Sequence, residues 1–241
     1  MPYRFDLVEV LNPLAAEKAL GMNGEHHYEE LNRPQTMKGE KPMKAKETAL
    51  VLIEFQNEFC KEGGQSHDLV KSEMARQNMI PNAVKLVENA RKKGAWIIYA
   101  PYIFDEEYYN KFKMQGIIKQ TADSTGWRRG SWGVEIIDEL KPQPGDKILQ
   151  GKTTLCAFNH TDLEPILREN KIRNIVLAGF MTNFCIEGTA RTAYDRGYYV
   201  TVIKNAIATS TPEEQRFTEE KIFPALGQLM TVDQFLNQLG A

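Results

Sequence analysis

Short, continuously apolar segments alternate with amphipathic segments along most of this 241-residue chain. Segments 49–55, 95–100 and 174–178 are rich in Val, Ile, Leu and Ala and lack a polar residue at every second position. A strand with one solvated face alternates apolar and polar residues, whereas a strand covered by helices on both faces is apolar throughout. Between the first two segments, residues 78–93 place their apolar side chains at helical spacing and end at Gly94. The pattern predicts an α/β fold, a three-layer α/β/α sandwich with a mostly parallel sheet.

The same alternation continues to the end of the chain, so we assign residues 47–241 to one domain. Its further predicted elements are a strand at 147–150, a helix at 185–196, a strand at 198–203, a helix at 212–223, a strand near 228 and a helix from 231. Residues 1–46 are interrupted by Pro and Gly and are predicted to be an N-terminal extension. Such an extension either packs on the domain or a neighbouring subunit, or remains a mobile arm.

Charge and composition exclude several classes of protein. Thirty Lys and Arg against 32 Asp and Glu give a net charge of -2, which provides no basic field for nucleic acid. The longest apolar runs fall far short of the roughly 20 residues that span a bilayer, so no membrane partner is expected. Cys60, Cys156 and Cys185 form no CxxC pair and encode neither a disulfide framework nor a thiolate zinc site. We therefore expect a reducing compartment, the cytoplasm.

Two ionisable residues follow predicted strands directly. Open parallel sheets carry their sites beyond the carboxyl ends of the strands. Glu54 comes immediately after Leu52 and Ile53, where partial desolvation makes a carboxylate a usable proton acceptor. The alternative is a charge that simply emerges into solvent. Lys152 follows the strand at 147–150 and would stabilise a nearby anion, although most lysines are surface groups.

Cys185 begins a predicted helix after the strand and turn Gly179-Phe180-Met181-Thr182-Asn183-Phe184. Unpaired N–H groups and the helix dipole lower the pKa of a thiol at such a position and can also receive an oxyanion. The alternative is a buried structural cysteine. Of the other cysteines, we expect Cys156 in the core and Cys60 in a loop.

Taken in order and at these separations, the segments resemble the isochorismatase-like cysteine hydrolase superfamily, with its Rossmann-like fold. The resemblance covers about residues 47–238. It rests on Glu54 with Gln56-Asn57-Glu58-Phe59, on Trp132-Gly133, on Lys152 through Ala157-Phe158, and on Gly179 through Cys185 with Thr189-Ala190-Arg191. It implies hydrolysis of a C–N bond in a small amide or ureide.

The resemblance also implies the roles of the site residues. Glu54, Lys152 and Cys185 would form the catalytic triad: the carboxylate takes the thiol proton, Cys185 attacks the carbonyl carbon, and water hydrolyses the resulting thioester. The superfamily has a non-proline cis peptide that corresponds here to Phe180-Met181. The N–H groups of Met181 and Cys185 would then form the oxyanion hole.

The chain departs from the superfamily pattern at its acids. The triad acid is normally Asp, and here it is Glu54; Glu58 likewise stands where the pattern has Asp. One methylene moves a carboxylate by roughly 1–1.5 Å, a distance to which positioned proton transfer is sensitive. Two alternatives therefore stay open: vinyl ether hydrolysis of the isochorismatase type, in which the acid protonates the substrate, and an inactive member with a binding role.

A second departure concerns the metal. Nicotinamidases of the superfamily carry Asp-x-His-x-His after the second strand, whereas residues 101–107 here contain no histidine. We therefore expect no catalytic metal and no other cofactor, with Asp105, Glu106 and Glu107 on a solvated loop.

The substrate is expected to be a small molecule bound against an aromatic wall. Candidates for that wall are Tyr102, Phe104, Tyr108, Trp127, Trp132, Phe158 and Phe184. Arg128 and Arg129 are candidates for binding a substrate carboxylate, although adjacent arginines in a glycine-bounded loop equally suit a solvated or subunit-contact feature. The resemblance further implies a homo-oligomer, a dimer or a tetramer.

Overall fold

The computed structural model describes residues 43–240, so almost all of the predicted extension at 1–46 lies outside the described residues. The strands are β1 (Met43–Lys44), β2 (Thr48–Ile53), β3 (Trp96–Ala100), β4 (Lys147–Ile148), β5 (Asn174–Phe180), β6 (Tyr199–Ala208), β7 (Gly227–Met230) and β8 (Leu239–Gly240). The α-helices are α4 (Asn57–Cys60), α5 (His67–Arg76), α6 (Met79–Lys92), α7 (Glu106–Phe112), α8 (Gly116–Ala122), α9 (Leu163–Glu169), α10 (Glu187–Asp195), α11 (Pro212–Phe217), α12 (Phe223–Leu226) and α13 (Val232–Gln238).

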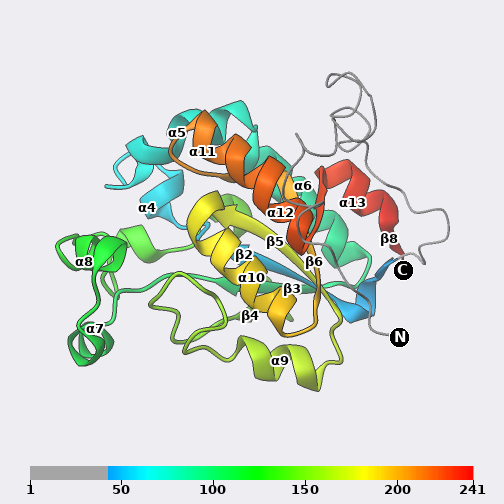
Figure 1. Ribbon diagram of the computed structural model, residues 1–241, viewed down its shortest axis with the longest axis horizontal. Coiled ribbons are helices and arrows are strands. Elements are labelled where there is room, and N and C mark those ends of the chain that lie inside the picture. The colour runs from blue at the N-terminus through cyan, green and yellow to red at the C-terminus, as the bar shows by residue number, and fades with distance from the viewer. Residues whose placement is uncertain (1–42, 241) are drawn as a thin grey trace, which may run out of the picture. The chain divides into compact units, whose positions relative to one another are not determined.

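The main sheet has the order β4-β3-β2-β5-β6-β7, and every neighbouring pair in it is parallel. β2 is central, with Val51 beside Ile98 of β3 on one side and Leu177 of β5 on the other. Helices flank both faces of this sheet (Figure 1). The predicted α/β/α sandwich with a parallel sheet is therefore confirmed.

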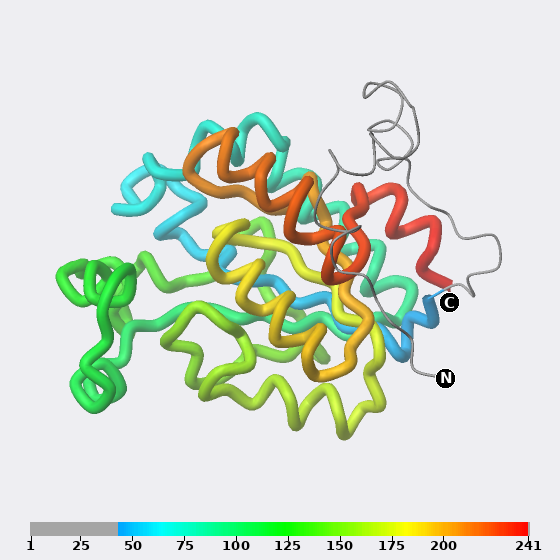
Figure 2. The backbone as a smooth tube through the Cα atoms, viewed as in Figure 1, coloured from blue at the N-terminus to red at the C-terminus, as the bar shows by residue number. Residues whose placement is uncertain are grey.

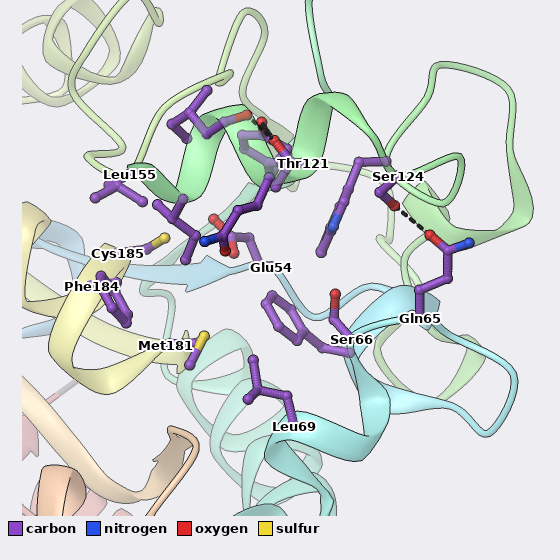
Figure 3. Close-up of a pocket in the computed structure, with 16 residues that line it drawn as sticks. Glu54, Gln65, Ser66, Leu69, Thr121, Ser124, Leu155, Met181, Phe184 and Cys185 are labelled. Atoms are coloured by element: carbon purple, nitrogen blue, oxygen red, sulfur yellow. Dashed lines mark hydrogen bonds between the residues drawn. The ribbon is translucent and has the colours of Figure 1, made fainter. Parts of the chain in front are cut away.

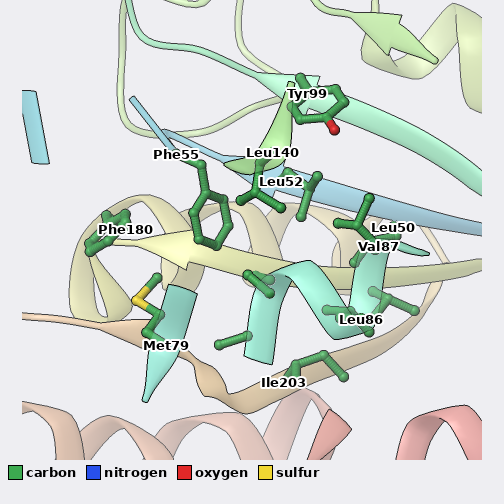
Figure 4. Packing of buried hydrophobic residues seen from close by; sticks show 14 of the residues in the cluster. Leu50, Leu52, Phe55, Met79, Leu86, Val87, Tyr99, Leu140, Phe180 and Ile203 are labelled. Carbon is green, nitrogen blue, oxygen red and sulfur yellow. The ribbon is translucent and has the colours of Figure 1, made fainter. Parts of the chain in front are cut away.

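Every strand of the sheet except β4 contributes side chains to two separate hydrophobic layers. All six residues of β2 are buried. Ala49, Val51 and Ile53 pack in the layer that contains residues of α9 and α10, while Leu50 and Leu52 pack in the opposite layer, which contains residues of α6 and α13. Figure 4 shows this second layer, with Leu50 next to Val87 of α6. Because side chains alternate between faces that are both covered, the strand sequence is apolar throughout.

Two predicted helices differ from the observed ones. The predicted helix at 185–196 is the α-helix α10 preceded by a π-helical turn at Thr182–Ile186, so Cys185 lies in that turn. The predicted helix at 212–223 consists of α11, a second π-helical turn at Thr218–Ile222, and then α12. A π-helical turn widens the backbone hydrogen bonding to i→i+5 over only five residues here, a stretch too short to show in the sequence pattern.

Besides the short α4, three helices were not predicted from the sequence: α5, α7 and α8. α5 buries only Val70 and Glu73, α8 buries only Ile118, and α7 buries no side chain. Since none presents an apolar stripe to the core, none produces the helical hydrophobic period. All three lie beyond the carboxyl ends of the strands (Figures 1 and 2).

The ends of the described chain lie together at the opposite side of the domain. β1 pairs in parallel with β8, so that Met43 is beside Leu239. Ala45, which follows, is fully buried. Within residues 43–240, no helix is long and apolar enough to cross a bilayer.

Candidate active site

Glu54 and Lys152 form a buried ion pair at the carboxyl ends of the strands. Glu54 follows β2 with φ at 59°, in the left-handed region, and only 4% of the residue is exposed. Lys152 is 2% exposed. Its Nζ donates to Glu54 Oε1 and, at 3.0 Å, to the carbonyl oxygen of Thr154. The ammonium is therefore satisfied within the protein and fixes the position of the carboxylate.

Cys185 joins this pair from the neighbouring strand, β5. The residue is 5% exposed, and its side chain points toward Glu54 (Figure 3). Its sulfur lies close enough to the Glu54 carboxylate and to the backbone N–H of Met181 for both groups to shift the pKa of the thiol. The structure thus brings together Glu54, Lys152, Met181 and Cys185, which the sequence analysis had selected from separate segments. The peptide bond between Phe180 and Met181 is cis.

Gly179 permits this convergence. Its φ is +130°, and a Cβ placed on it would lie 1.8 Å from the carbonyl oxygen of Ile53. Only glycine avoids that clash. The end of β5 therefore approaches the end of β2 closely enough for the Cys185 turn to face Glu54.

The electrostatics of the thiol differ from the expectation. Burial raises the pKa of Cys185 above its ordinary range, and the negative charge of Glu54 raises it further; Lys152 and the Met181 N–H only partly oppose these effects. The prediction that the helix N-terminus lowers this pKa is therefore wrong, and the resting sulfur carries its proton. Burial lowers the pKa of Lys152, but the charges of Glu54 and Cys185 outweigh burial and raise it overall, so the ammonium stays charged.

A second acid, Glu58, is also buried, with 2% of the residue exposed. Burial raises its pKa, and this effect is partly offset by hydrogen bonds from the backbone of Gln65 and from the backbone and side chain of Ser66. A Cβ on Gly126 would lie 2.0 Å from Glu58 Oε2, and one on Gly133 would lie 2.6 Å from it. The two glycines thus make room for a carboxylate that holds the start of α5 in place.

A cavity of about 250 Å³ opens beside the Cys185 sulfur. Cys185 and Glu54 lie at one end of it, and Gln65 and Ser124 lie at the other (Figure 3). The residues that line it are Glu54, Phe59, Gln65, Ser66, Leu69, Tyr102, Ile117, Ile118, Gln120, Thr121, Ser124, Trp127, Leu155, Met181, Phe184 and Cys185. The walls are mainly apolar, so the cavity suits a small molecule with an apolar body.

The predicted aromatic wall is partly present. Tyr102, Trp127 and Phe184 line the cavity. The Lys152 ammonium lies over the Tyr102 ring, with Nζ 5.3 Å from the ring centroid. The same ring packs edge-on against Trp127. These side chains therefore connect the ion pair to the cavity wall.

Four of the predicted wall residues do not line the cavity. Tyr108, in α7, has its ring centroid 5.0 Å from that of His160. Phe104 is 6% exposed and belongs to the core rather than to the cavity. Trp132 is 48% exposed, because its loop turns the indole outward. Phe158 packs in the other hydrophobic layer, with its ring centroid 6.0 Å from that of Tyr198. The prediction that these residues line the cavity is therefore wrong.

Neither arginine beside Trp127 faces the cavity. The Arg128 guanidinium lies 4.2 Å from the centroid of the Phe104 ring, and its Nη2 donates to the carbonyl oxygen of Ala122 at 2.5 Å. Arg129 is exposed to solvent. Neither is among the residues that line the cavity.

Sequence reasoning missed the part of the wall that α5 and α8 supply. Ser66 and Leu69 come from the start of α5, and Ile117, Ile118 and Thr121 come from α8. These residues lie on helices rather than at the strand ends, where the site was expected. The only local sign was Leu69 or Ile117 standing in an otherwise polar segment.

The two remaining cysteines differ from expectation. Cys60 is in α4 rather than in a loop, and it is 7% exposed. Burial raises the pKa of its thiol. Cys156 is only partly buried, and its sulfur lies 3.2 Å from Thr192 Oγ1.

The acids proposed for a solvated loop are exposed. Asp105, Glu106 and Glu107 stand at the start of α7, where the Asp105 carboxylate accepts from the N–H of Tyr108 at 2.7 Å. Within residues 43–240, no group of three or more His, Cys, Asp and Glu side chains is arranged to hold a metal ion. The absence of a metal in the reaction stays a prediction.

The sequence and the fold of this chain match known proteins. The family model for the isochorismatase domain matches residues 48–234. A protein named ureidoacrylate amidohydrolase RutB from Rhizobium rhizogenes is 32% identical over 207 residues, which covers 80% of this chain and 83% of the relative. The chain therefore belongs to the isochorismatase family.

Solved structures show the same fold. A cysteine hydrolase from Pseudomonas syringae pv. phaseolicola superposes with a TM-score of 0.67 at 23% identity, covering 83% of this chain and 95% of that one. N-carbamoylsarcosine amidase from Thermoplasma acidophilum superposes with a TM-score of 0.60 at 24% identity, covering 78% of this chain and 97% of that one.

Proposed function

We propose that this protein hydrolyses a C–N bond of a small amide or ureide, with Cys185 as the nucleophile. One observation carries the proposal: Cys185, Glu54 and Lys152 meet at the end of a cavity of about 250 Å³. The names of the relatives support it, since the Rhizobium protein is called an amidohydrolase and the Thermoplasma protein an amidase.

Proton transfer to Glu54 begins the reaction. Because the thiol is protonated at rest, its proton passes to the Glu54 carboxylate as the sulfur attacks the carbonyl carbon. Lys152 keeps its charge throughout and stabilises the developing thiolate. Glu54 then returns the proton to the nitrogen, the C–N bond breaks, and the amine or ammonia leaves. Water, deprotonated by Glu54, hydrolyses the thioester and restores the thiol.

The carbonyl oxygen becomes an anion in the tetrahedral intermediate, and backbone N–H groups stabilise it. Met181 and Cys185 supply these N–H groups in our proposal. The Met181 N–H is near enough to the Cys185 sulfur to lower the pKa of the thiol, and both residues line the cavity, so this N–H is near the position where the carbonyl must bind. Loss of one such donor typically lowers kcat by about 10²–10³-fold.

Ammonia release from a panel of small amides and ureas tests the proposal. The native protein should release ammonia, and Cys185→Ala should abolish release because the nucleophile is missing. Cys156→Ser is the matched control, since Cys156 does not line the cavity, and it should retain activity. Hydrolysis that persists in Cys185→Ala would exclude a covalent mechanism. Absence of hydrolysis throughout the panel would favour an inactive member.

We also propose that residues 47–241 form the hydrolase domain, that residues 1–46 extend it, and that the protein is a cytoplasmic homo-oligomer. Large apolar side chains at the surface support association: Phe112 is 54% exposed, Phe217 is 58% exposed and Tyr199 is 64% exposed. Light scattering after size-exclusion chromatography gives the mass of the assembly, and a monomer at micromolar concentration would contradict the oligomer.

A further inference from the structure

We infer that the substrate of this site is an uncharged amide or urea with an apolar body, and that the cavity selects against a substrate carboxylate. The inference rests on the proposed function and specifies its substrate class. It follows from the charges around the cavity, which offer a carboxylate no cationic partner.

The walls supplied by the described residues contain no lysine, arginine or histidine. Apolar side chains make up most of the surface, among them Phe59, Leu69, Ile117, Trp127 and Leu155. A carboxylate that leaves water for such a surface needs a charged or hydrogen-bonding partner there. An alkyl or aromatic group, by contrast, gains free energy from the same surface.

Lys152, which pairs with Glu54, and Arg128, which follows Trp127 in the chain, are already engaged by other groups. Lys152 is fully buried behind Glu54, and its Nζ donates to that carboxylate and to the Thr154 carbonyl. Arg128 covers the Phe104 ring and donates to a backbone carbonyl. Neither can turn to a substrate without breaking the contacts that hold it.

The N-terminus of α5, which borders the cavity through Gln65 and Ser66, is another place, besides the proposed oxyanion hole, where the described wall could receive an anion. Glu58 occupies it from inside the protein. Its carboxylate accepts the Gln65 N–H at 3.1 Å and is also bonded to the backbone and side chain of Ser66. These donors are therefore unavailable to a substrate carboxylate, and the charge of Glu58 opposes its approach.

The end of the cavity opposite Cys185 carries uncharged polar groups. Ser124 Oγ donates to Gln65 Oε1 at 2.5 Å, and Gln65 Nε2 donates to Thr125 Oγ1 at 3.3 Å. Amide and hydroxyl groups recognise an uncharged hydrogen-bonding group without adding a charge. This end suits a substrate with a hydroxyl, ether or amide group there, or a substrate with no polar group there.

The inference separates this chain from the Rhizobium relative, because the ureidoacrylate in that relative's name carries a carboxylate. An identity of 32% leaves ample room for such a change in the cavity wall. The test therefore compares substrates that differ in charge and little else.

N-carbamoyl-β-alanine and 3-methylbutylurea are such a pair, since the carboxylate of the first corresponds in shape to the isopropyl group of the second. Glutaramate and 5-methylhexanamide form a second pair with an amide in place of the urea. We expect kcat/KM for ammonia release to be at least about 30-fold higher for the uncharged member of each pair. Equal values, or a preference for the carboxylate, would overturn the inference.

Introducing a cation at the cavity mouth tests the electrostatic reason. Leu69 lines the cavity and is 49% exposed, so a longer polar side chain fits there. Leu69→Arg should reduce the preference for the uncharged member at least about tenfold, as expected for one charge-assisted contact. Leu69→Gln, its matched uncharged control, should change the preference by less than about threefold. Equal effects of the two variants would contradict the electrostatic argument.

A binding measurement keeps this inference distinct from the proposed function. Calorimetric titration of Cys185→Ser with the same pairs needs no turnover, and the uncharged member should bind more tightly. Tighter binding without ammonia release from the native protein would overturn the hydrolase proposal and support the selectivity. Ammonia release from the native protein, together with tighter binding of the carboxylate member, would support the hydrolase proposal and overturn the selectivity. Absence of both release and binding for every compound would overturn both.

Discussion

Replacing Lys152 by Met tests the buried ion pair at the centre of the site. The substitution keeps most of the side-chain length and removes the ammonium. The Lys152 side chain is fully buried and that of Glu54 is 5% exposed, so water cannot replace the lost partner. Breaking a buried pair by removing one charge typically costs about 3–5 kcal/mol. Since domains are stable by about 5–15 kcal/mol, Lys152→Met should lose a large part of the free energy of unfolding.

Urea unfolding at pH 7, followed by fluorescence, measures this loss. Lys71→Met is the control, because Lys71 and its partner Asp68 are both at the surface with side chains 58% and 84% exposed, and no measurable change is expected. The double variant Lys152→Met with Glu54→Gln removes both charges and should be more stable than Lys152→Met alone. A loss below about 1 kcal/mol, or a double variant no more stable than the single one, would refute the reasoning.

Four further predictions follow from the same site. Gly179→Ala should lower stability by about 3 kcal/mol or more in urea unfolding, because its Cβ would lie 1.8 Å from the Ile53 carbonyl oxygen; an unchanged midpoint would contradict that contact. The raised pKa of Cys185 predicts that alkylation by iodoacetamide, followed by peptide mass spectrometry, accelerates up to pH 9 without a plateau, whereas a plateau below pH 8 would indicate a preformed thiolate. Burial raises the pKa of Glu58 above the unfolded value, so the folded state binds its proton more tightly and stability should fall as the pH rises above about 4.5; Glu58→Gln should flatten that fall in thermal melts. Glu54→Asp should lower kcat at least about tenfold, because a shorter side chain withdraws the carboxylate from the sulfur; a gain in rate would show that the longer acid is a handicap.

The parallel sheet was predictable because burial on both faces leaves a clear trace in the sequence. β2, for example, is apolar at every position except its first, and it is buried at every position. The helices that pack on the sheet, such as α6, were predicted for a related reason, since they must cover an apolar layer. The helices α5 and α8, which do not cover the sheet, were missed because they bury few side chains and therefore carry no apolar stripe.

The site was predictable only in part. Glu54, Lys152 and Cys185 each follow a strand, and strand ends converge in an open parallel sheet. The cavity wall depends instead on how irregular segments fold over that edge. Nothing in the sequence distinguishes Trp127, which lines the cavity, from Trp132, which is 48% exposed. The pKa of the thiol was mispredicted for a similar reason: local sequence indicates a helix start but not the extent of burial.

The charge balance of the site connects the chemistry to the choice of substrate. At rest the cluster holds one ammonium on Lys152, one carboxylate on Glu54 and a neutral thiol on Cys185, so these three groups sum to zero. After proton transfer the cluster holds the ammonium, a neutral carboxyl and a thiolate, and the sum is still zero. Charge thus moves within the cluster without a net charge being created in a buried place, which keeps the transfer inexpensive. A substrate carboxylate would add a charge that neither state of the cluster compensates, with Glu58 nearby and already holding the adjacent N–H donors. The neutrality that allows a protonated thiol to react is therefore also what makes an uncharged substrate the better partner.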